Sequence, residues 1–545
     1  MTAFDRAEAL ERLGRERFDV LVIGGGVTGA GVAVDAAARG LRTAIVERDD
    51  WASGTSSKSS KLVHGGLRYL QQKEYRLVYE NLAERQRLLV NAPHLVAELP
   101  FLIPLFGKDG VVNAGLAKAY STALWLYDLT GGLRIGKRHK RISREEALRH
   151  LPTLRADRLV AAFVYYDART DDARLTLALV RTAVLDHGAV AVNHAAVTGL
   201  VREGGRVSGA TLADGTVIRA AAVVNAAGVW ADDVRALDEG THPDSIRPAK
   251  GIHVTVPATR LPCDIAAVIP VPKDRRSIFV VPWGSETYVG TTDTDYDGPL
   301  EDPECTPADV AYLLDAINLA TSSGLTIADI TGTWAGLRPL VKAATSERTA
   351  DLSRRHQVST SASGVVSVTG GKLTTYRKMA ADAVDVVVGA VGRGSRRSPT
   401  KKLRIHGALG VPVLREPGAA ARLGVDPALL DHLIGRYGDE APQVLALTRD
   451  DPDLGLPLVP GLPYIRAEAV WAVTAEMATT LSDVLARRTR AQLRARDATA
   501  AAAEGVAALI APLLGWDTDE AARQVAAYRE AVEHEREAAD LPVTA

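Results

Sequence analysis

Residues 18–47, FDVLVIGGGVTGAGVAVDAAARGLRTAIVE, decide the fold of this chain. An apolar run typical of a buried strand leads into a glycine turn, which opens a helix of small residues. A second short strand follows, so this order predicts a βαβ unit. Gly24, Gly26 and Gly29 have the G-x-G-x-x-G spacing within the turn, and Glu47 ends the second strand.

This glycine turn predicts a dinucleotide site. Gly24 permits the tight turn, Gly26 lets a pyrophosphate approach the backbone, and Gly29 lets the helix pack closely on the sheet. Free N–H groups at the start of the helix favour the anion, and the Glu47 carboxylate is suited to the ribose hydroxyls. A glycine turn without a ligand is the alternative, and the flanking strands together with Glu47 argue against it.

Two features favour FAD over NAD, which the glycine spacing alone does not separate. The strand-rich region 190–229 and the later Gly370-Gly371 turn look like returns to one extended dinucleotide. The run 54–70, GTSSKSSKLVHGGLRYL, supplies glycines and hydroxyls suited to close contact with a pyrophosphate and a flavin ring.

Length and composition bound the class of protein. The 545 residues are 47% hydrophobic and 24% charged, as in ordinary multidomain globular proteins. The net charge of -1 argues against a nucleic-acid partner. Two cysteines fit a reducing compartment. With a polar start and no uncharged apolar stretch near about 18 residues, we expect a cytoplasmic protein, at most peripheral on the cytoplasmic face of the membrane.

The order of these patterns predicts an interleaved domain organisation. We expect a nucleotide-binding domain from 18–85, 166–235 and 341–392, and a substrate domain from 86–165 and 236–340. Residues 393–545 are predicted to be helical, with one apolar helical face from Val470 to Leu485 and a helix at 518–538 begun by Thr518.

Several separated motifs resemble the flavin-dependent glycerol-3-phosphate dehydrogenases, a family of the glycine/D-amino-acid oxidase superfamily. They occur in the family's order over about residues 18–390: 24–41, 54–70, DDARL at 171–175, VVNAAGVWAD at 223–232, KGIHVTVP at 250–257, GTTDTDY at 290–296, GLRPL at 336–340 and TGGKLTTYRKMA at 369–380. The resemblance implies an α/β fold: a Rossmann-type FAD-binding domain, an inserted α+β substrate domain and an all-helical C-terminal cap domain. Lys58, within the serine run, is the main departure.

The resemblance also assigns site residues. It implies FAD contacts, through side chains or backbone, from Gly24, Gly26, Gly29, Glu47, Thr55, Ser56, Ser60, Lys61, Leu62, Val197, Gly228, Gly371, Leu373 and Thr374. It implies substrate contacts from Arg68, Tyr69, Arg338 and Lys372, with His253 and His64 nearby. No metal is expected.

Elementary chemistry supports these substrate residues. Arginine binds phosphate through two parallel hydrogen bonds, and Arg68 and Arg338 lie in glycine- or proline-flanked turns. For either arginine alone, a solvated surface charge is the alternative. Lys372 stands at a helix start, where a cation is unfavourable unless an anion is bound. A histidine suits proton removal near neutral pH, and we expect His253 before His64; a structural hydrogen-bonding role is the alternative for each.

The expected reaction is oxidation of sn-glycerol 3-phosphate to dihydroxyacetone phosphate by hydride transfer from C2 to FAD. The resemblance implies a membrane quinone as acceptor; an oxidase using oxygen, an amine or amino-acid oxidase and a non-catalytic flavoprotein are the alternatives. Trp125 and Tyr127 beside the basic run 137–141 could form an interfacial anchor, and a core helix followed by a solvated basic loop is the alternative that we favour. A homodimer is a further possibility for the helical region.

Overall fold

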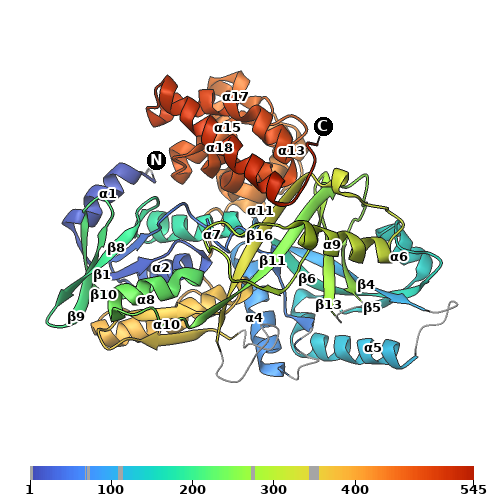
Figure 1. Cartoon of the computed structure of the whole chain (residues 1–545), viewed down its shortest axis with the longest axis horizontal. Helices are drawn as coiled ribbons and strands as arrows, with labels where there is room; N and C mark the ends of the chain where they lie inside the picture. Colours follow the sequence, from blue (N-terminus) through green and yellow to red (C-terminus); the bar gives the residue numbers. More distant parts are fainter. Residues whose placement is uncertain are drawn as a thin grey trace.

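The computed structural model describes residues 4–67, 69, 74–107, 114–271, 276–342 and 355–544. Figure 1 shows two sheet-containing domains side by side, with the helices of the C-terminal part of the chain above them. This arrangement confirms the predicted fold class, a Rossmann-type domain and an α+β domain with a helical C-terminal domain.

The first sheet contains the glycine turn. Its strands follow the order β17-β18-β10-β1-β2-β7, and β9 joins β8 to β10. The five strands from β18 to β7 run parallel, and their apolar residues are buried, as expected for a covered parallel sheet. The strands are β1 Arg17–Ile23, β2 Thr43–Val46, β7 Val190–Val192, β8 Val197–Glu203, β9 Arg206–Leu212, β10 Val217–Asn225, β17 Gln357–Thr360 and β18 Val366–Thr369.

Helix α2 is the central helix of this domain. It contacts β1 and β2 and packs against α7 and α10. A Cβ on Gly31 would lie 2.7 Å from the Tyr376 ring, so the missing side chain allows α10 to approach. The helices of this domain are α1 Arg6–Arg15, α2 Val27–Ala38, α7 Asp172–Arg181, α8 Ala231–Glu239 and α10 Tyr376–Val391.

The second sheet is mixed and mostly antiparallel. It follows the order β15-β11-β14-β13-β12-β4-β6-β3, with β16 paired to β11 and β5 to β6. The strands are β3 Leu62–Val63, β4 Val96–Phe106, β5 Lys140–Ser143, β6 Leu159–Thr170, β11 Ile246–Pro257, β12 Ala266–Val271, β13 Arg276–Trp283, β14 Glu286–Gly290, β15 Thr294–Asp295 and β16 Gly332–Val341. Its helices are α4 Tyr75–Asn91, α5 Ala114–Leu129, α6 Arg144–His150 and α9 Pro307–Ala320.

The C-terminal domain is helical in its described residues, 398–544. Its helices are α11 Val411–Leu414, α12 Ala419–Leu423, α13 Pro427–Tyr437, α14 Ala441–Asp450, α15 Arg466–Glu476, α16 Ala491–Arg494, α17 Arg496–Leu514 and α18 Thr518–Ala538, with a π-helical turn at Asp483–Arg488. By length and composition α17 could cross a membrane, and in this fold it packs against α15 and α18.

One local prediction for this domain is wrong, and a second, the helix at 518–538, is confirmed in its bounds but not in its cap. The apolar residues from Val470 to Leu485 do not share one helix, because α15 ends at Glu476 and its C-cap, Met477, has a left-handed backbone with φ 55°. Helix α18 is capped by Asp517 and not by Thr518: the Asp517 carboxylate accepts the N–H of Glu520. Either residue suits an N-cap by type, so the backbone geometry decides between them.

Candidate functional site

The glycine turn lies where β1 meets α2. Gly24 has φ 111°, and a Cβ there would lie 2.7 Å from the Ala226 carbonyl oxygen. A Cβ on Gly29 would lie 1.9 Å from the Gly24 oxygen. Helix α2 has Gly26 as its N-cap, which offers no side chain to cap the helix, and no acidic residue in its first turn. The turn therefore fits a pyrophosphate held by backbone N–H groups and the helix dipole.

Glu47 lies beside this turn and is buried. Its carboxylate accepts the N–H of Gly25 at 2.5 Å and that of Asp49 at 2.9 Å. Burial raises its pKa, and these two hydrogen bonds oppose the rise. The Ala195 N–H donates to the Glu47 carbonyl, two residues before Val197 at the start of β8. The position suits the adenosine end of a dinucleotide, and ribose binding by Glu47 stays a prediction.

The run 54–61 crosses from the first sheet to the second. The Thr55 hydroxyl donates to the Leu337 carbonyl at 2.6 Å, and Ser56 Oγ accepts the Val27 N–H at 2.9 Å. Beyond it, Leu62 begins β3, which pairs with β6 of the second sheet. Hydroxyls of this run therefore contact both the start of α2 and the strand that carries Arg338. We name residues 54–61 the crossing loop.

His253 lies on β11 against the crossing loop. Its Nε2 is 2.9 Å from Ser60 Oγ, and its ring stacks on Trp334 with centroids 4.7 Å apart. Its buried Nδ1 has no hydrogen-bond partner among the residues that the structure describes. Burial, and then the charges of Lys61 and Arg338, hold the pKa of His253 well below its usual value. The imidazole is therefore neutral, as a proton acceptor must be.

Arg338 lies on β16, the strand paired with β11. Its guanidinium donates to Asp293 at 3.1 Å, to the Thr291 hydroxyl at 3.2 Å and to the Thr292 carbonyl at 3.1 Å. A Cβ on Gly251 would lie 2.4 Å from Nη2, so glycine is needed beside it. Arg338 is thus an oriented cation in the second sheet, close enough to His253 to affect its pKa.

The turn that follows β18, at residues 370–372, lies close to residues 64–69, which follow the crossing loop in the sequence. Gly371 has φ 78°, and Lys372 Nζ lies 3.8 Å from the centre of the Tyr69 ring. The Thr374 hydroxyl accepts the His64 N–H at 3.2 Å. The predicted pair Tyr69 and Lys372 is therefore in contact, and Leu373 and Thr374 start a short 3₁₀ turn beside it. The predicted Arg68 lies outside the described residues.

Gly228 approaches the glycine turn from β10. It has φ 63° and begins a 3₁₀ turn, while the preceding Ala226 donates its N–H to the Ile23 carbonyl at 2.9 Å. The fold thus brings the predicted glycines of three sequence regions to neighbouring strand ends, where ligands of open α/β sheets bind. These donors fit FAD, while the individual contacts assigned from the resemblance stay predictions.

Sequence reasoning missed a buried ionic network behind the crossing loop. Lys61 Nζ contacts Asp172 at 3.1 Å and also donates to the Ser57 carbonyl. Burial, and then the charge of Arg490, lowers the pKa of Lys61 to about 8, and Asp172 opposes this shift. Asp172 belongs to the motif DDARL, but its partner Arg490 lies in the helical domain, in a run rich in arginine from 487 to 496.

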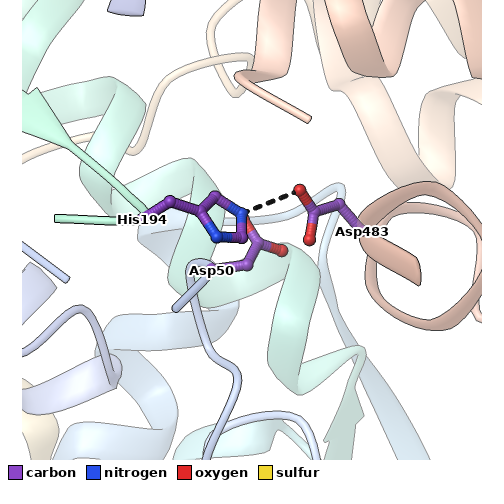
Figure 2. Close-up of side chains that lie close together, drawn as sticks. All are labelled: Asp50, His194 and Asp483. Atoms are coloured by element: carbon purple, nitrogen blue, oxygen red, sulfur yellow. Dashed lines mark hydrogen bonds and ion pairs between the residues drawn. The ribbon is translucent and has the colours of Figure 1, made fainter. Parts of the chain in front are cut away.

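A second cluster joins Asp50, His194 and Asp483 (Figure 2). His194 Nε2 lies 3.1 Å from Asp483, and the three side chains have the donor types of a metal site. Arg487 and Arg488 already neutralise the two carboxylates. Two adjacent guanidinium charges oppose a divalent cation, so we assign the cluster to contact between the first and the helical domains.

Comparison with known proteins gives consistent matches over nearly the whole chain. A family described as FAD dependent oxidoreductase matches residues 19–377, and one described as the C-terminal domain of alpha-glycerophosphate oxidase matches residues 398–521. The glycerol-3-phosphate dehydrogenase of Mycobacterium leprae is 44% identical, over 97% of this chain and 90% of that protein. The mitochondrial glycerol-3-phosphate dehydrogenase of Homo sapiens is 36% identical, over 94% and 72%. The crystal structure of glycerol-3-phosphate dehydrogenase from Bacillus halodurans complexed with FAD matches 100% of both chains, with 32% identity and a TM-score of 0.79.

Proposed function

The chain belongs to the FAD-dependent oxidoreductases and, within them, to the glycerol-3-phosphate dehydrogenase family, and on this basis we propose that it oxidises sn-glycerol 3-phosphate to dihydroxyacetone phosphate. FAD is the cofactor, and when bound it would supply the acceptor for the hydride that we propose leaves C2 of the substrate. The observation that carries the proposal is the position of an oriented guanidinium, Arg338, beside a buried neutral imidazole, His253, at the crossing loop.

The cations of the site suit a phosphorylated triol. Arg338 is held by Asp293 and Thr291, so its orientation is set before a ligand binds, and Lys372 stands at the start of a helical turn on the Tyr69 ring. A phosphate dianion suits this pair, because a guanidinium can donate two parallel hydrogen bonds and an ammonium adds a compact positive charge. We propose that they bind the phosphate and polarise the hydroxyl, together with Arg68 as the resemblance implies.

Proton removal from the C2 hydroxyl is assigned to His253. If Nε2–H donates to Ser60 Oγ, the other ring nitrogen carries the lone pair that accepts the proton. Burial, and then the charges of Lys61 and Arg338, lower the pKa of His253, and a bound anionic substrate would offset the part due to these charges. His64 is the second candidate, supported by its backbone hydrogen bond to Thr374 beside Lys372.

The direct test is anaerobic mixing of the purified FAD-loaded protein with glycerol 3-phosphate. We expect the flavin absorbance near 450 nm to be bleached, and sarcosine to leave it unchanged. A flavin that glycerol 3-phosphate does not reduce would overturn the proposed function. Reduction by sarcosine instead would support the amine oxidase alternative.

The electron acceptor is proposed to be a membrane quinone. The match of residues 398–521 to a domain described for an oxidase is the observation that favours oxygen as the alternative. Peroxide released in air at the rate of substrate oxidation would support oxygen. Turnover in air without a quinone analogue should otherwise stay far below turnover with one.

A membrane surface is proposed to contact helices α4 and α5. These helices lie along the lower edge of the molecule in Figure 1, opposite the helical domain. They expose large apolar side chains that include Tyr79, Trp125 and Leu129, and the last is 70% exposed. Exposed Lys137 and Lys140 follow α5, although each pairs with a glutamate. Tyr127 is buried and hydrogen-bonded to Asp167, so the anchor predicted from Trp125 and Tyr127 is wrong for Tyr127.

A vesicle sedimentation assay tests this surface. We expect the double variant Trp125→Ser, Leu129→Ser to pellet several-fold less with anionic vesicles than the unchanged protein, because apolar area is lost from the bound face. Leu409→Ser is the matched control, since Leu409 is also highly exposed but belongs to the helical domain. Equal pelleting of all three proteins would contradict the assignment.

A further inference from the structure

The arginine-rich segment 487–496 lies at the contact between the helical domain and the other two domains. Arg488 pairs with Asp50 of the first domain, Arg490 with Asp172, and Arg494 with Glu286 of the second sheet. All three arginines are buried. Buried ion pairs need full hydrogen bonding to offset desolvation, so each of them demands a defined position of the helical domain.

Among these arginines, Arg490 reaches the crossing loop. Its backbone is left-handed with φ 67°, and its side chain is 2% exposed. Nη2 donates to the Ser57 carbonyl at 2.5 Å and to Asp172 at 3.1 Å. A non-glycine residue in this conformation is strained, and the surrounding contacts must hold it there. The helical domain thus contacts the backbone of the loop that resembles an FAD-binding segment.

Asp172 connects Arg490 to the crossing loop through hydrogen bonds of its own. It is fully buried and accepts hydrogen bonds from the N–H of Ser59 at 3.0 Å, from the Ser59 hydroxyl at 2.7 Å and from Lys61 Nζ. Arg490 and Lys61 are the cations that oppose the Asp172 charge. Without Arg490, Asp172 would lose one of the two charge partners that it has among the described residues, and the Ser57 carbonyl would lose a donor.

Ser60 lies between the two residues that Asp172 holds. Its Oγ is 2.9 Å from His253 Nε2, and its carbonyl accepts the Tyr288 hydroxyl at 2.9 Å. The neighbouring Ser59 carbonyl accepts Trp334 Nε1, and Trp334 stacks on the His253 ring. The position of the Ser60 hydroxyl, and with it the orientation of His253, therefore depends on both flanking residues.

We propose that Arg490 is a positioning residue of the oxidation site, through which the helical domain holds the crossing loop so that Ser60 orients His253. The proposal rests on the proposed function for the role of His253. It gives the helical domain a part in the reaction although the domain itself supplies no residue to His253 among the described contacts. Loss of the contact would let Ser60 move and the imidazole turn.

Arg490→Gln is the first test, measured as the limiting rate of anaerobic flavin reduction at saturating glycerol 3-phosphate. We expect a loss of roughly tenfold or more, with FAD still bound and a smaller change in the apparent KM, because base orientation and not substrate binding is impaired. Arg490→Lys keeps the charge beside Asp172 and should recover part of the rate. If Arg490→Gln does not fold, the limiting rate of Arg490→Lys is compared with that of the unchanged protein instead.

Arg181→Gln is the matched control. Arg181 is also buried and forms a bidentate ion pair with Glu440 of the helical domain. It is the last residue of α7, whereas Asp172 is the first. It should lose thermal stability as Arg490→Gln does but keep the limiting rate. An equal rate loss in both variants would reduce Arg490 to a structural contact and overturn the proposal.

Two further measurements separate this proposal from the proposed function. Ser60→Ala should slow the reaction, and combining it with Arg490→Gln should add little, because both act through one orientation. Fully additive losses contradict the proposal. Amide hydrogen exchange in peptides spanning 54–64 should rise in Arg490→Gln and not in Arg181→Gln, whatever the substrate is. Unchanged exchange would refute the positioning role, whereas a wild-type flavin that glycerol 3-phosphate fails to reduce refutes only the function.

Discussion

At the scale of single residues, burial and charge act on His253 in the same direction. The imidazole is inside the second domain, and both Lys61 and Arg338 face it, so its protonated form is unfavourable. Arg338 is itself only partly buried, and its described acceptors include Asp293, the Thr291 hydroxyl and the Thr292 carbonyl. The site therefore combines a neutral imidazole with a fixed cation, two groups that would serve proton removal and charge stabilisation in the proposed oxidation.

Arg338→Ala should lower kcat/KM for glycerol 3-phosphate by about 100-fold or more, because it removes a forked donor to the phosphate or the developing alkoxide. FAD content should be unchanged. Steady-state kinetics and the visible spectrum of the purified variant measure both effects. Arg338→Lys keeps only a point charge, so we expect its kcat/KM to lie between those of the unchanged enzyme and of Arg338→Ala. Kinetics of Arg338→Ala equal to those of the unchanged enzyme would refute the assigned role.

At the scale of elements, the local patterns of the nucleotide-binding parts were sufficient for prediction. The strand at 18–23, the small-residue helix and the strand at 43–46 correspond to β1, α2 and β2. The Gly370-Gly371 turn likewise lies between β18 and α10. These elements could be predicted because the apolar pattern and the glycines that specify them lie within a few residues of each other in the sequence. The face from Val470 to Leu485 failed because a helical period does not report a left-handed break such as Met477.

Gly29→Ala tests the element that binds the cofactor. Its Cβ would lie 1.9 Å from a backbone oxygen of the glycine turn, so α2 must move away from β1. We expect the variant to lose most bound FAD, measured by the ratio of flavin to protein absorbance. Gly389→Ala is the control: it lies in α10 with no atom within 4 Å of the added Cβ, and it should gain about 0.5–1 kcal/mol of stability. Retention of FAD by Gly29→Ala at the wild-type level would contradict this reading.

At the scale of the whole molecule, the helical domain is joined to the first domain through buried charges. Beside the Arg181–Glu440 pair lies His406, which contacts both Asp186 and Glu440. Burial opposes its charge, but these hydrogen bonds prevail and raise the pKa of His406 to about 9. The same contacts lower the pKa of Glu440 to about 2 against the effect of burial. The ion pairs at this contact are thus present throughout the neutral range.

This contact should make stability depend on pH. A histidine whose pKa rises on folding stabilises the fold fully below the unfolded pKa of about 6.5, and the effect is lost as pH rises through about 9. His94 nearby, with its pKa lowered to about 3 chiefly by burial, is neutral in the folded state across that window, and because both proteins contain it, its titration cancels in the comparison. We expect His406→Gln to cost about 1–2 kcal/mol near pH 6.5, after allowance for solvent screening. Thermal melts of both proteins should converge above pH 9; a constant difference would contradict the mechanism.

The amino-acid sequence by itself predicted the glycine turn from the spacing of its glycines. It predicted the fold class, the cofactor and the family from several separated motifs whose order along the chain resembles that family. Only the tertiary structure decided that Tyr127 is buried, that Ser60 contacts His253, and that Arg490 reaches Asp172 from a distant part of the chain. Such contacts carry no local pattern, since the partners come from different domains and the cost of burying their charges is met only when the domains pack.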